Sequence, residues 1–292
     1  MLRLVLPKGS LERATLELFE AADLAVRRSS TVDYRASIDD PRIADVRILR
    51  PQEIPEYVAS GLFDLGITGR DWIEETESTV TSLGQLSYSK TTAQPIRVVL
   101  AVAEASPVST VADLPAGSRV ATEYPRLTAR YLASHGVDAR VMLSYGATEA
   151  KIPEIADAVV EITETGRALR AAGLRILDTV LVSHTELVAN PLAYEDPERR
   201  HAMHQIHTLL SGTLEARGKV LVKLNVGEED LDRVIALLPA LKAPTVSQLF
   251  GDHGGFAVET VVAKADINRL IPALKDQGAT GILELPIAKI VH

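Results

Sequence analysis

Residues 156–170 bring together a carboxylate, hydroxyl groups and a glycine that could bind a phosphorylated sugar. The apolar run 156–160 reads as a short buried strand, Glu161 lies at its carboxyl end, and the polar loop 163–166 (Thr-Glu-Thr-Gly) follows. A carboxylate accepts hydrogen bonds from sugar hydroxyls, and threonine hydroxyls and free backbone N–H groups at a helix start bind phosphate. A glycine lets the backbone approach an anion closely. The pattern therefore favours a ribose 5-phosphate group.

The elements around this loop must present it to a ligand. In parallel α/β sheets, ligands bind beyond the carboxyl ends of the strands, and a helical run from Arg167 would direct its N-terminus at the loop. Asp157 is four residues from Glu161 and shares its face of the strand, but only Glu161 is placed to reach a ligand at the loop. The alternative is an ordinary strand–turn–helix connection with a capping threonine, and the local pattern alone leaves both interpretations open.

Three other strand ends carry charged side chains of the same kind. Lys8 lies in the turn after strand 2–6, and Arg50 follows strand 45–49. Asp71 follows the Thr-Gly turn after a strand at residues 65–67. Each could face a ligand at the same sheet edge. The alternatives are solvated charges for the two cations and helix capping for the aspartate.

Composition excludes several classes of function. The chain has 292 residues, with 46% hydrophobic and 24% charged residues, as is typical of a globular protein with a substantial core. Its net charge of −8 gives no footprint for nucleic acid, and the absence of cysteine excludes disulfides and thiolate catalysis. His201, His204 and His207 have no carboxylates at ligand spacing, so we expect no metal site of the protein's own.

Targeting signals are not evident in the sequence. The N-terminus enters a strand directly and lacks a signal-peptide pattern, and no stretch has the length and apolarity of a membrane span. We therefore expect a cytoplasmic protein without a membrane partner.

The order of predicted elements indicates an α/β fold with a two-lobed core that resembles periplasmic binding proteins. Residues 1–91 and 177–215 would form catalytic lobe I, and residues 92–176 would form lobe II. The polar stretch 87–94 is a candidate hinge, and the ligand would lie between the lobes. The remaining predicted strands of the core are 96–103, 119–122, 137–143 and one long apolar strand at 176–188, and its main helices are 11–24, 126–135 and 196–218.

The last segment, residues 216–292, repeats a strand–helix–strand pattern. The predicted order is βαββαβ, which is a ferredoxin-like fold. Its strands would be 220–226, 245–249, 256–263 and 280–285, and its helices 228–241 and 266–277. A separate small module appended to a cleft enzyme suggests a regulatory domain, although a fold alone does not define a function.

Taken together, the motifs resemble those of the ATP phosphoribosyltransferase family in its long form, the first enzyme of histidine biosynthesis. The resemblance runs in order along the whole chain and rests on Leu6–Gly9, Leu49–Pro51, Asp64–Asp71, Ala121–Pro125, Gly146 with Glu149, Ala156–Glu161 with Thr165-Gly166, and Ala243–Ser247. Three positions depart from the family pattern. Ser10 stands where arginine is frequent, Glu161 replaces a usual aspartate, and Ala168 replaces a usual threonine.

The resemblance implies a reaction in which N1 of ATP attacks C1′ of 5-phosphoribosyl 1-diphosphate (PRPP), giving phosphoribosyl-ATP and pyrophosphate, with Mg²⁺ carried by the substrate. It implies Glu149, Glu161 and Lys8 as catalytic residues. The implied PRPP site comprises Asp157, Glu161, Ile162, Thr163, Glu164, Thr165, Gly166, Arg167 and Ala168. The implied nucleotide site comprises Arg50, Asp71, Tyr124 and Pro125.

For the last domain, the resemblance implies allosteric inhibition by histidine in a homo-oligomer, dimer and hexamer. The implied pocket comprises Asn225, Leu241, Ala243, Thr245, Val261 and Gly281. The runner-up hypothesis is a cytoplasmic two-lobed small-molecule-binding protein or sensor without catalytic activity. Exported binding proteins share the two-lobed fold, but a signal peptide is not evident here, and residue 1 leaves no room for a preceding helix-turn-helix segment.

Overall fold

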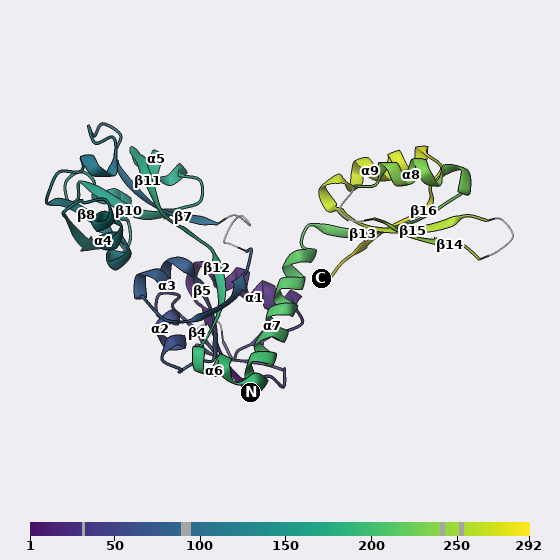
Figure 1. Ribbon diagram of the computed structural model, residues 1–292, viewed down its shortest axis with the longest axis horizontal. Coiled ribbons are helices and arrows are strands. Elements are labelled where there is room, and N and C mark those ends of the chain that lie inside the picture. Colours follow the sequence, from purple (N-terminus) through teal and green to yellow (C-terminus); the bar gives the residue numbers. More distant parts are fainter. Residues whose placement is uncertain (31–32, 89–94, 240–242, 251–253) are drawn as a thin grey trace. The chain divides into compact units, whose positions relative to one another are not determined.

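The structure, a computed structural model, describes residues 1–30, 33–88, 95–239, 243–250 and 254–292 (Figure 1). The chain divides into two compact units, residues 1–210 and residues 211–292. The first unit contains two sheets, which we call lobe I and lobe II, and the second contains one. The fold class predicted from the sequence, a two-lobed α/β core followed by a ferredoxin-like domain, is confirmed.

Lobe I contains a seven-stranded sheet in the order β2-β3-β4-β1-β5-β12-β6. β4 and β5 are parallel to β1 on its two sides, so the carboxyl ends of these three strands share one edge. The alternation of buried residues, as in Val5 and Val188, matches a sheet with a packed face. The strands are β1 (Leu2–Pro7), β2 (Val26–Arg27), β3 (Arg35–Ile38), β4 (Ile43–Leu49), β5 (Leu65–Gly69), β6 (Thr81–Gln85) and β12 (Thr185–Ala189).

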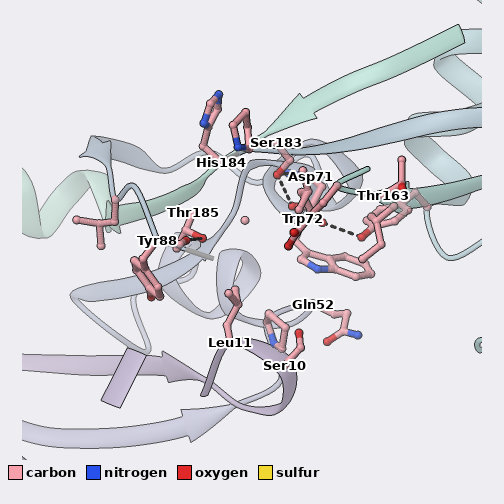
Figure 2. A pocket seen from close by; sticks show the side chains of 18 of the residues that line it. Ser10, Leu11, Gln52, Asp71, Trp72, Tyr88, Thr163, Ser183, His184 and Thr185 are labelled. Carbon is pink, nitrogen blue, oxygen red and sulfur yellow. Dashed lines mark hydrogen bonds between the residues drawn. The ribbon is translucent and has the colours of Figure 1, made fainter. Parts of the chain in front are cut away.

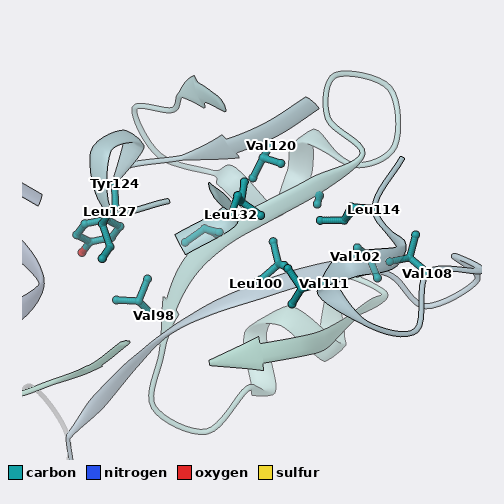
Figure 3. Close-up of a cluster of buried hydrophobic side chains, with 12 residues drawn as sticks. Val98, Leu100, Val102, Val108, Val111, Leu114, Val120, Tyr124, Leu127 and Leu132 are labelled. Carbon is teal, nitrogen blue, oxygen red and sulfur yellow. The ribbon is translucent and has the colours of Figure 1, made fainter. Parts of the chain in front are cut away.

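Lobe II contains a five-stranded mixed sheet in the order β11-β7-β10-β8-β9. β10 is parallel to β8 but antiparallel to β7. Its near-continuous apolar runs are explained by burial on both faces, with Val98, Leu100 and Val102 on one side (Figure 3) and Val99 and Ala101 on the other. The strands are β7 (Ile96–Ala103), β8 (Ser118–Thr122), β9 (Ala139–Leu143), β10 (Ala158–Thr163) and β11 (Leu174–Ser183).

The single long strand predicted at residues 176–188 is wrong. The run divides at His184 into β11, which pairs with β7 in lobe II, and β12, which pairs with β5 and β6 in lobe I. Both halves are apolar because both are sheet strands, so hydrophobicity alone could not reveal the change of sheet.

The helices of the core follow the predicted order with shorter bounds. Pro55 and Pro125 stand in the first turns of α2 and α4, where a missing N–H costs nothing. The helices are α1 (Glu12–Ala21), α2 (Ile54–Ala59), α3 (Arg70–Thr76), α4 (Pro125–Ser134), α5 (Arg167–Ala171), α6 (Pro191–Glu195) and α7 (Pro197–Ala216).

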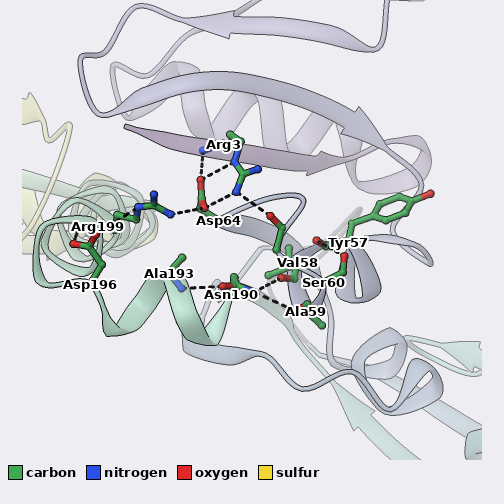
Figure 4. A network of polar contacts seen from close by, with 11 residues as sticks. Arg3, Tyr57, Val58, Ala59, Ser60, Asp64, Asn190, Ala193, Asp196 and Arg199 are labelled. Atoms are coloured by element: carbon green, nitrogen blue, oxygen red, sulfur yellow. Dashed lines mark hydrogen bonds and ion pairs between the residues drawn. The ribbon is translucent and has the colours of Figure 1, made fainter.

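A polar network ties the start of α7 to the sheet of lobe I (Figure 4). The Asp64 carboxylate accepts hydrogen bonds from the backbone and guanidinium of Arg3 and from Arg199. Asn190 accepts the Ala193 N–H at the start of α6 and donates to the carbonyl of Val58. Although burial opposes it, hydrogen bonding to Arg3 holds the pKa of Asp64 below its ordinary value.

The second unit has the sheet order β14-β15-β13-β16, which is the antiparallel arrangement of a ferredoxin-like fold. The strands are β13 (Lys219–Val226), β14 (Thr245–Gln248), β15 (Phe256–Ala263) and β16 (Thr280–Pro286). The helices α8 (Leu231–Leu237) and α9 (Ile267–Asp276) lie on the same face of the sheet (Figure 1). They cover Val222, Leu224 and Val258, so the opposite face of this sheet stays open within the unit.

Candidate active site

A cavity of about 310 Å³ lies within the first unit and is lined by residues of both lobes (Figure 2). This volume lies at the lower end of the range for small-molecule sites. The lining residues are Ser10, Leu11, Pro51, Gln52, Gly69, Asp71, Trp72, Leu86, Ser87, Tyr88, Pro95, Ile96, Glu123, Tyr124, Ile162, Thr163, Glu164, Ser183, His184 and Thr185. Strand ends far apart in the sequence therefore meet here, as expected for a ligand site between lobes.

Aromatic side chains form one wall of the cavity. The rings of Trp72 and Tyr124 are 4.5 Å apart between centroids and come from lobe I and lobe II. Tyr88 is almost fully buried, and its hydroxyl is 2.8 Å from that of Thr15. Flat aromatic surfaces of this kind suit a planar heterocycle.

Asp71, predicted as a nucleotide-binding residue, lines this wall but is buried and bonded on both carboxylate oxygens. One oxygen accepts the Ser183 hydroxyl at 2.6 Å, and the other accepts the Tyr124 hydroxyl at 2.7 Å. Burial raises the pKa of Asp71, while these hydroxyls lower it. Burial also raises the pKa of Tyr124 well above its usual range, which keeps that phenol protonated and donating. The protein's own groups therefore occupy the Asp71 carboxylate.

Glu161, on β10, lies in a different polar environment. Its carboxylate accepts the Ile162 N–H at 2.8 Å and the Thr148 hydroxyl. Burial raises its pKa, and the nearby Glu123 and Glu149 contribute in the same direction. Glu161 therefore has fewer protein donors than Asp71 and lies in a cluster of acids.

Glu123 is a lining residue that the sequence reasoning missed. Burial raises its pKa, whereas the charge of Lys151 lowers it. Lys151 also donates to the hydroxyl of Ser144, which is 2.8 Å from that of Thr148. A chain of polar groups thus connects the cavity to Glu161. The only local sign was its place directly before Tyr124.

The predicted phosphate loop begins in the cavity and continues beyond its lining. Ile162, Thr163 and Glu164 line the cavity, followed in the chain by Thr165, Gly166, Arg167 and Ala168. Gly166 has a φ of +73°, a conformation that glycine adopts without strain, and its N–H donates to the Thr163 hydroxyl at 2.7 Å. The loop therefore has the sharp turn that a phosphate cradle requires.

The remaining predicted residues divide into two groups. Lys8 and Arg50 follow β1 and β4, whose ends are paired at Pro7 and Leu49, so they emerge side by side; the Lys8 ammonium is 4.0 Å from the Tyr34 ring centroid. Pro125 begins α4. Asp157, by contrast, lies at the opposite end of β10 from the loop and forms a bidentate pair with Arg119.

A basic hollow in lobe I is a second feature that the sequence reasoning missed. It has a volume of about 260 Å³ and is lined by Arg27, Arg28, Ser29, Arg35, Ala36 and Ser37. Arg28 pairs with Glu12, whose carboxylate also accepts the N–H of Gly9 beside Lys8. The hollow is thus connected to the turn after β1.

Metal and membrane features were also searched. Within the described ranges, no three His, Asp or Glu side chains are grouped as a metal site. In the same part of the chain, no helix is both long and apolar enough to span a membrane.

Comparisons with known proteins define the class. The family model of ATP phosphoribosyltransferase matches residues 50–212, and that of the HisG C-terminal domain matches residues 216–289. The chain therefore belongs to the ATP phosphoribosyltransferase family, in the long form that carries this C-terminal domain, and is a phosphoribosyl-transferring enzyme.

Two curated relatives and one solved structure illustrate the similarity. The ATP phosphoribosyltransferase of Solibacter usitatus is 48% identical over 291 residues, covering 100% of this chain and 99% of the relative. That of Chlorobium luteolum is 46% identical over 291 residues, covering 100% and 98%. A chain of the ATP phosphoribosyl transferase (HisG:HisZ) complex from Thermotoga maritima is 29% identical with a TM-score of 0.63, covering 74% of this chain and 99% of that chain.

Proposed function

We propose that this enzyme transfers the 5-phosphoribosyl group from PRPP to N1 of ATP. The observation that carries the proposal is the asymmetry of the cavity between the lobes. One wall is aromatic and suits adenine, and the other leads to Glu161 and the loop that starts at Thr163. Both substrates can therefore meet across one cavity, as transfer requires.

The chemistry needs positioning and charge stabilisation instead of a covalent nucleophile. The N1 lone pair forms a bond to C1′ while the bond from C1′ to the pyrophosphate oxygen breaks, and the leaving group takes the electron pair. Glu161 would accept hydrogen bonds from the ribose hydroxyls, and its negative charge would stabilise the positive charge that develops on the ring. Glu149 lies near it on the same side of lobe II.

The phosphate groups would be held at three places. The turn at Gly166 would cradle the 5-phosphate. Lys8 and Arg50 would neutralise polyphosphate at the edge of lobe I, and the basic hollow around Arg35 supports an anionic ligand there. Mg²⁺ bound to the pyrophosphate would neutralise the leaving group, and it would enter with substrate oxygens and water as most of its ligands.

For the C-terminal domain we propose a histidine site that inhibits the enzyme. Asn225, Thr245 and Val261 share the open face of the sheet, since their strand partners place them opposite the helices. Gly281 lies against the Asn225 amide, and Ala243 precedes β14, whereas Leu241 lies outside the described residues. Polar groups for the ligand's amino and carboxylate ends, with Val261 as an apolar wall, support the proposal.

The regulatory proposal includes the assembly and its location. We propose a homo-oligomer, dimer and hexamer, in which histidine favours one assembly state because it binds that state more tightly. The Thermotoga relative, in its complex with HisZ, also works as part of an assembly. We propose the cytoplasm as the site of action, as suits a biosynthetic enzyme.

Pyrophosphate release tests the catalytic proposal. Purified protein with Mg²⁺, ATP and PRPP should release pyrophosphate only when both substrates are present, and added histidine should slow the release. A binding protein or sensor without activity would bind a ligand but release nothing. That result would overturn the assignment.

Thr245→Trp tests the regulatory site. The indole should fill the proposed pocket at an exposed edge strand, so the variant should keep its activity and lose its sensitivity to histidine. Val246→Trp on the same strand is the control, because Val246 pairs with Val258 and belongs to the opposite face. A Thr245→Trp enzyme that stays fully sensitive, or wild type that shows no histidine binding by calorimetry, would refute the site.

A further inference from the structure

Helix α3 of lobe I carries two buried carboxylates on the face toward lobe II. Asp71 and Glu75 are four residues apart, so they lie on the same side of the helix one turn from each other. They are 3% and 8% exposed. Buried carboxylates are costly unless they accept hydrogen bonds, so their partners decide what they do.

Both carboxylates take their partners from the start of α4 in lobe II. Asp71 accepts the Tyr124 hydroxyl, as described above. Glu75 accepts the backbone N–H groups of Arg126 at 3.1 Å and Leu127 at 2.9 Å. These are the second and third residues of α4, whose N–H groups have no partner within a helix.

Helix α4 lacks a cap of its own. Its N-cap position is Tyr124, whose side chain makes no capping hydrogen bond, and Pro125 has no N–H. In most helices a Ser, Thr, Asp or Asn from the same chain segment supplies the acceptor. Here Glu75 supplies it from the other lobe, and its negative charge also suits the positive end of the helix dipole.

An outer contact continues the same interface at the surface. Arg130, one turn further along α4, pairs with Glu77 and donates to the carbonyl of Glu74 at 2.7 Å. The Arg130 and Glu77 side chains are 41% and 56% exposed. Exposed ion pairs contribute little, so the buried pair of carboxylates is the part that fixes the interface.

We propose that Glu75 is a positioning residue for phosphoribosyl transfer. By capping α4 across the two lobes, it holds the segment Glu123–Tyr124 against Trp72 and so keeps the aromatic wall in place. The catalytic half of this inference rests on the proposed function. Asp71 acts in the same interface, through Tyr124 and Ser183, and not by binding the nucleotide itself.

Glu75→Ala and Glu75→Gln test the proposal together. The alanine variant should raise the KM for ATP roughly five- to thirtyfold, the effect expected for a lost cap of a few kT. The glutamine variant keeps a carbonyl oxygen that can accept one or both N–H groups, so its KM should stay within about threefold of wild type. Glu77→Gln, at the exposed rim of the same interface, is the matched control and should match wild type.

A ligand-free measurement separates this inference from the catalytic assignment. The chain has no cysteine, so Glu56→Cys on lobe I and Ala133→Cys on lobe II can carry a pair of spin labels at exposed positions. The distribution of distances between the labels should broaden in Glu75→Ala and return to wild type in Glu75→Gln. An unchanged distribution in Glu75→Ala, or a KM for ATP as high in Glu75→Gln as in Glu75→Ala, would overturn the proposal. If wild type released no pyrophosphate, the proposed function would fail and the distance measurement would still decide the role of Glu75.

Discussion

The acids of lobe I and those of lobe II differ in how many donors the protein gives them. Asp64, Asp71 and Glu75 in lobe I each accept two or more hydrogen bonds from the chain. In lobe II, Glu161 accepts a neighbouring N–H and one hydroxyl, and the nearby Glu123 is influenced mainly by burial and Lys151. A carboxylate whose lone pairs are already used holds structure, whereas one with spare lone pairs can accept donors from a ligand.

Asp71→Ala should give the largest effect on stability if this comparison is right. The Tyr124 and Ser183 hydroxyls would lose their buried acceptor, at a cost of about 2–5 kcal/mol for the two donors. The melting temperature should fall by roughly 5–15 °C. Calorimetric unfolding is the measurement. Unchanged stability would mean that the carboxylate is available for another role.

Glu161→Ala should show the opposite pattern. Loss of the charged hydrogen bonds to the ribose hydroxyls should cost about 1.5–3 kcal/mol, and so lower kcat/KM for PRPP by roughly one to two orders of magnitude. The melting temperature should change little, because few protein donors depend on this side chain. Glu154→Ala, an exposed acid in the same lobe, is the control. Wild-type kinetics in Glu161→Ala would remove this residue from the site.

Gly166→Val sharpens the same contrast within lobe II. An added Cβ would lie 2.9 Å from the Arg170 guanidinium, in a loop proposed to cradle phosphate. Gly173→Val is a matched control, since Gly173 has almost the same φ, +72° against +73°, and open space around it. Both variants should lose similar stability from the positive φ, but only Gly166→Val should raise the KM for PRPP, by roughly tenfold. Equal KM values would refute the phosphate role of this turn.

Asp64→Asn gives the smallest expected effect and a pH dependence. The folded pKa of Asp64 is depressed, so its contribution is complete above the unfolded pKa of about 3.9 and is lost as the pH falls through the folded value. Removing the charge should cost roughly 1.5 kcal/mol at pH 7 and little at pH 2. Urea unfolding at both pH values measures this. A stability difference that is equal at the two pH values would show that Arg3 and Arg199 gain nothing from the charge.

Much of the fold could be predicted because its signals are local. The strands at residues 96–103 and 256–263 were predicted with the bounds that the structure has, since each is an apolar run between polar turns. The helix predicted at 228–241 is shorter, a 3₁₀ turn followed by α8. The short strands β2, β3 and β6 were missed, because edge strands with exposed residues carry little hydrophobic pattern.

The site was predictable only in part, for a related reason. Glu161, Thr163 and the Lys8 turn follow strands directly, so the rule of strand ends located them. Tyr88 and Glu123 line the cavity only because distant segments meet, and no local spacing encodes that meeting. The role of Asp71 depended likewise on Tyr124 and Ser183, 53 and 112 residues away.

The place of β12 in the sheet of lobe I has a consequence for synthesis on the ribosome. β6 pairs only with β12 in this sheet, and β12 emerges about a hundred residues later, after all of lobe II. At about 5–20 residues per second, β6 would wait roughly 5–20 s for its neighbour, while lobe II can already fold as a continuous segment. We expect nascent chains stalled with residues 1–180 outside the exit tunnel to protect lobe II from protease but leave residues 81–85 open to cleavage. Chains with residues 1–210 outside should protect both.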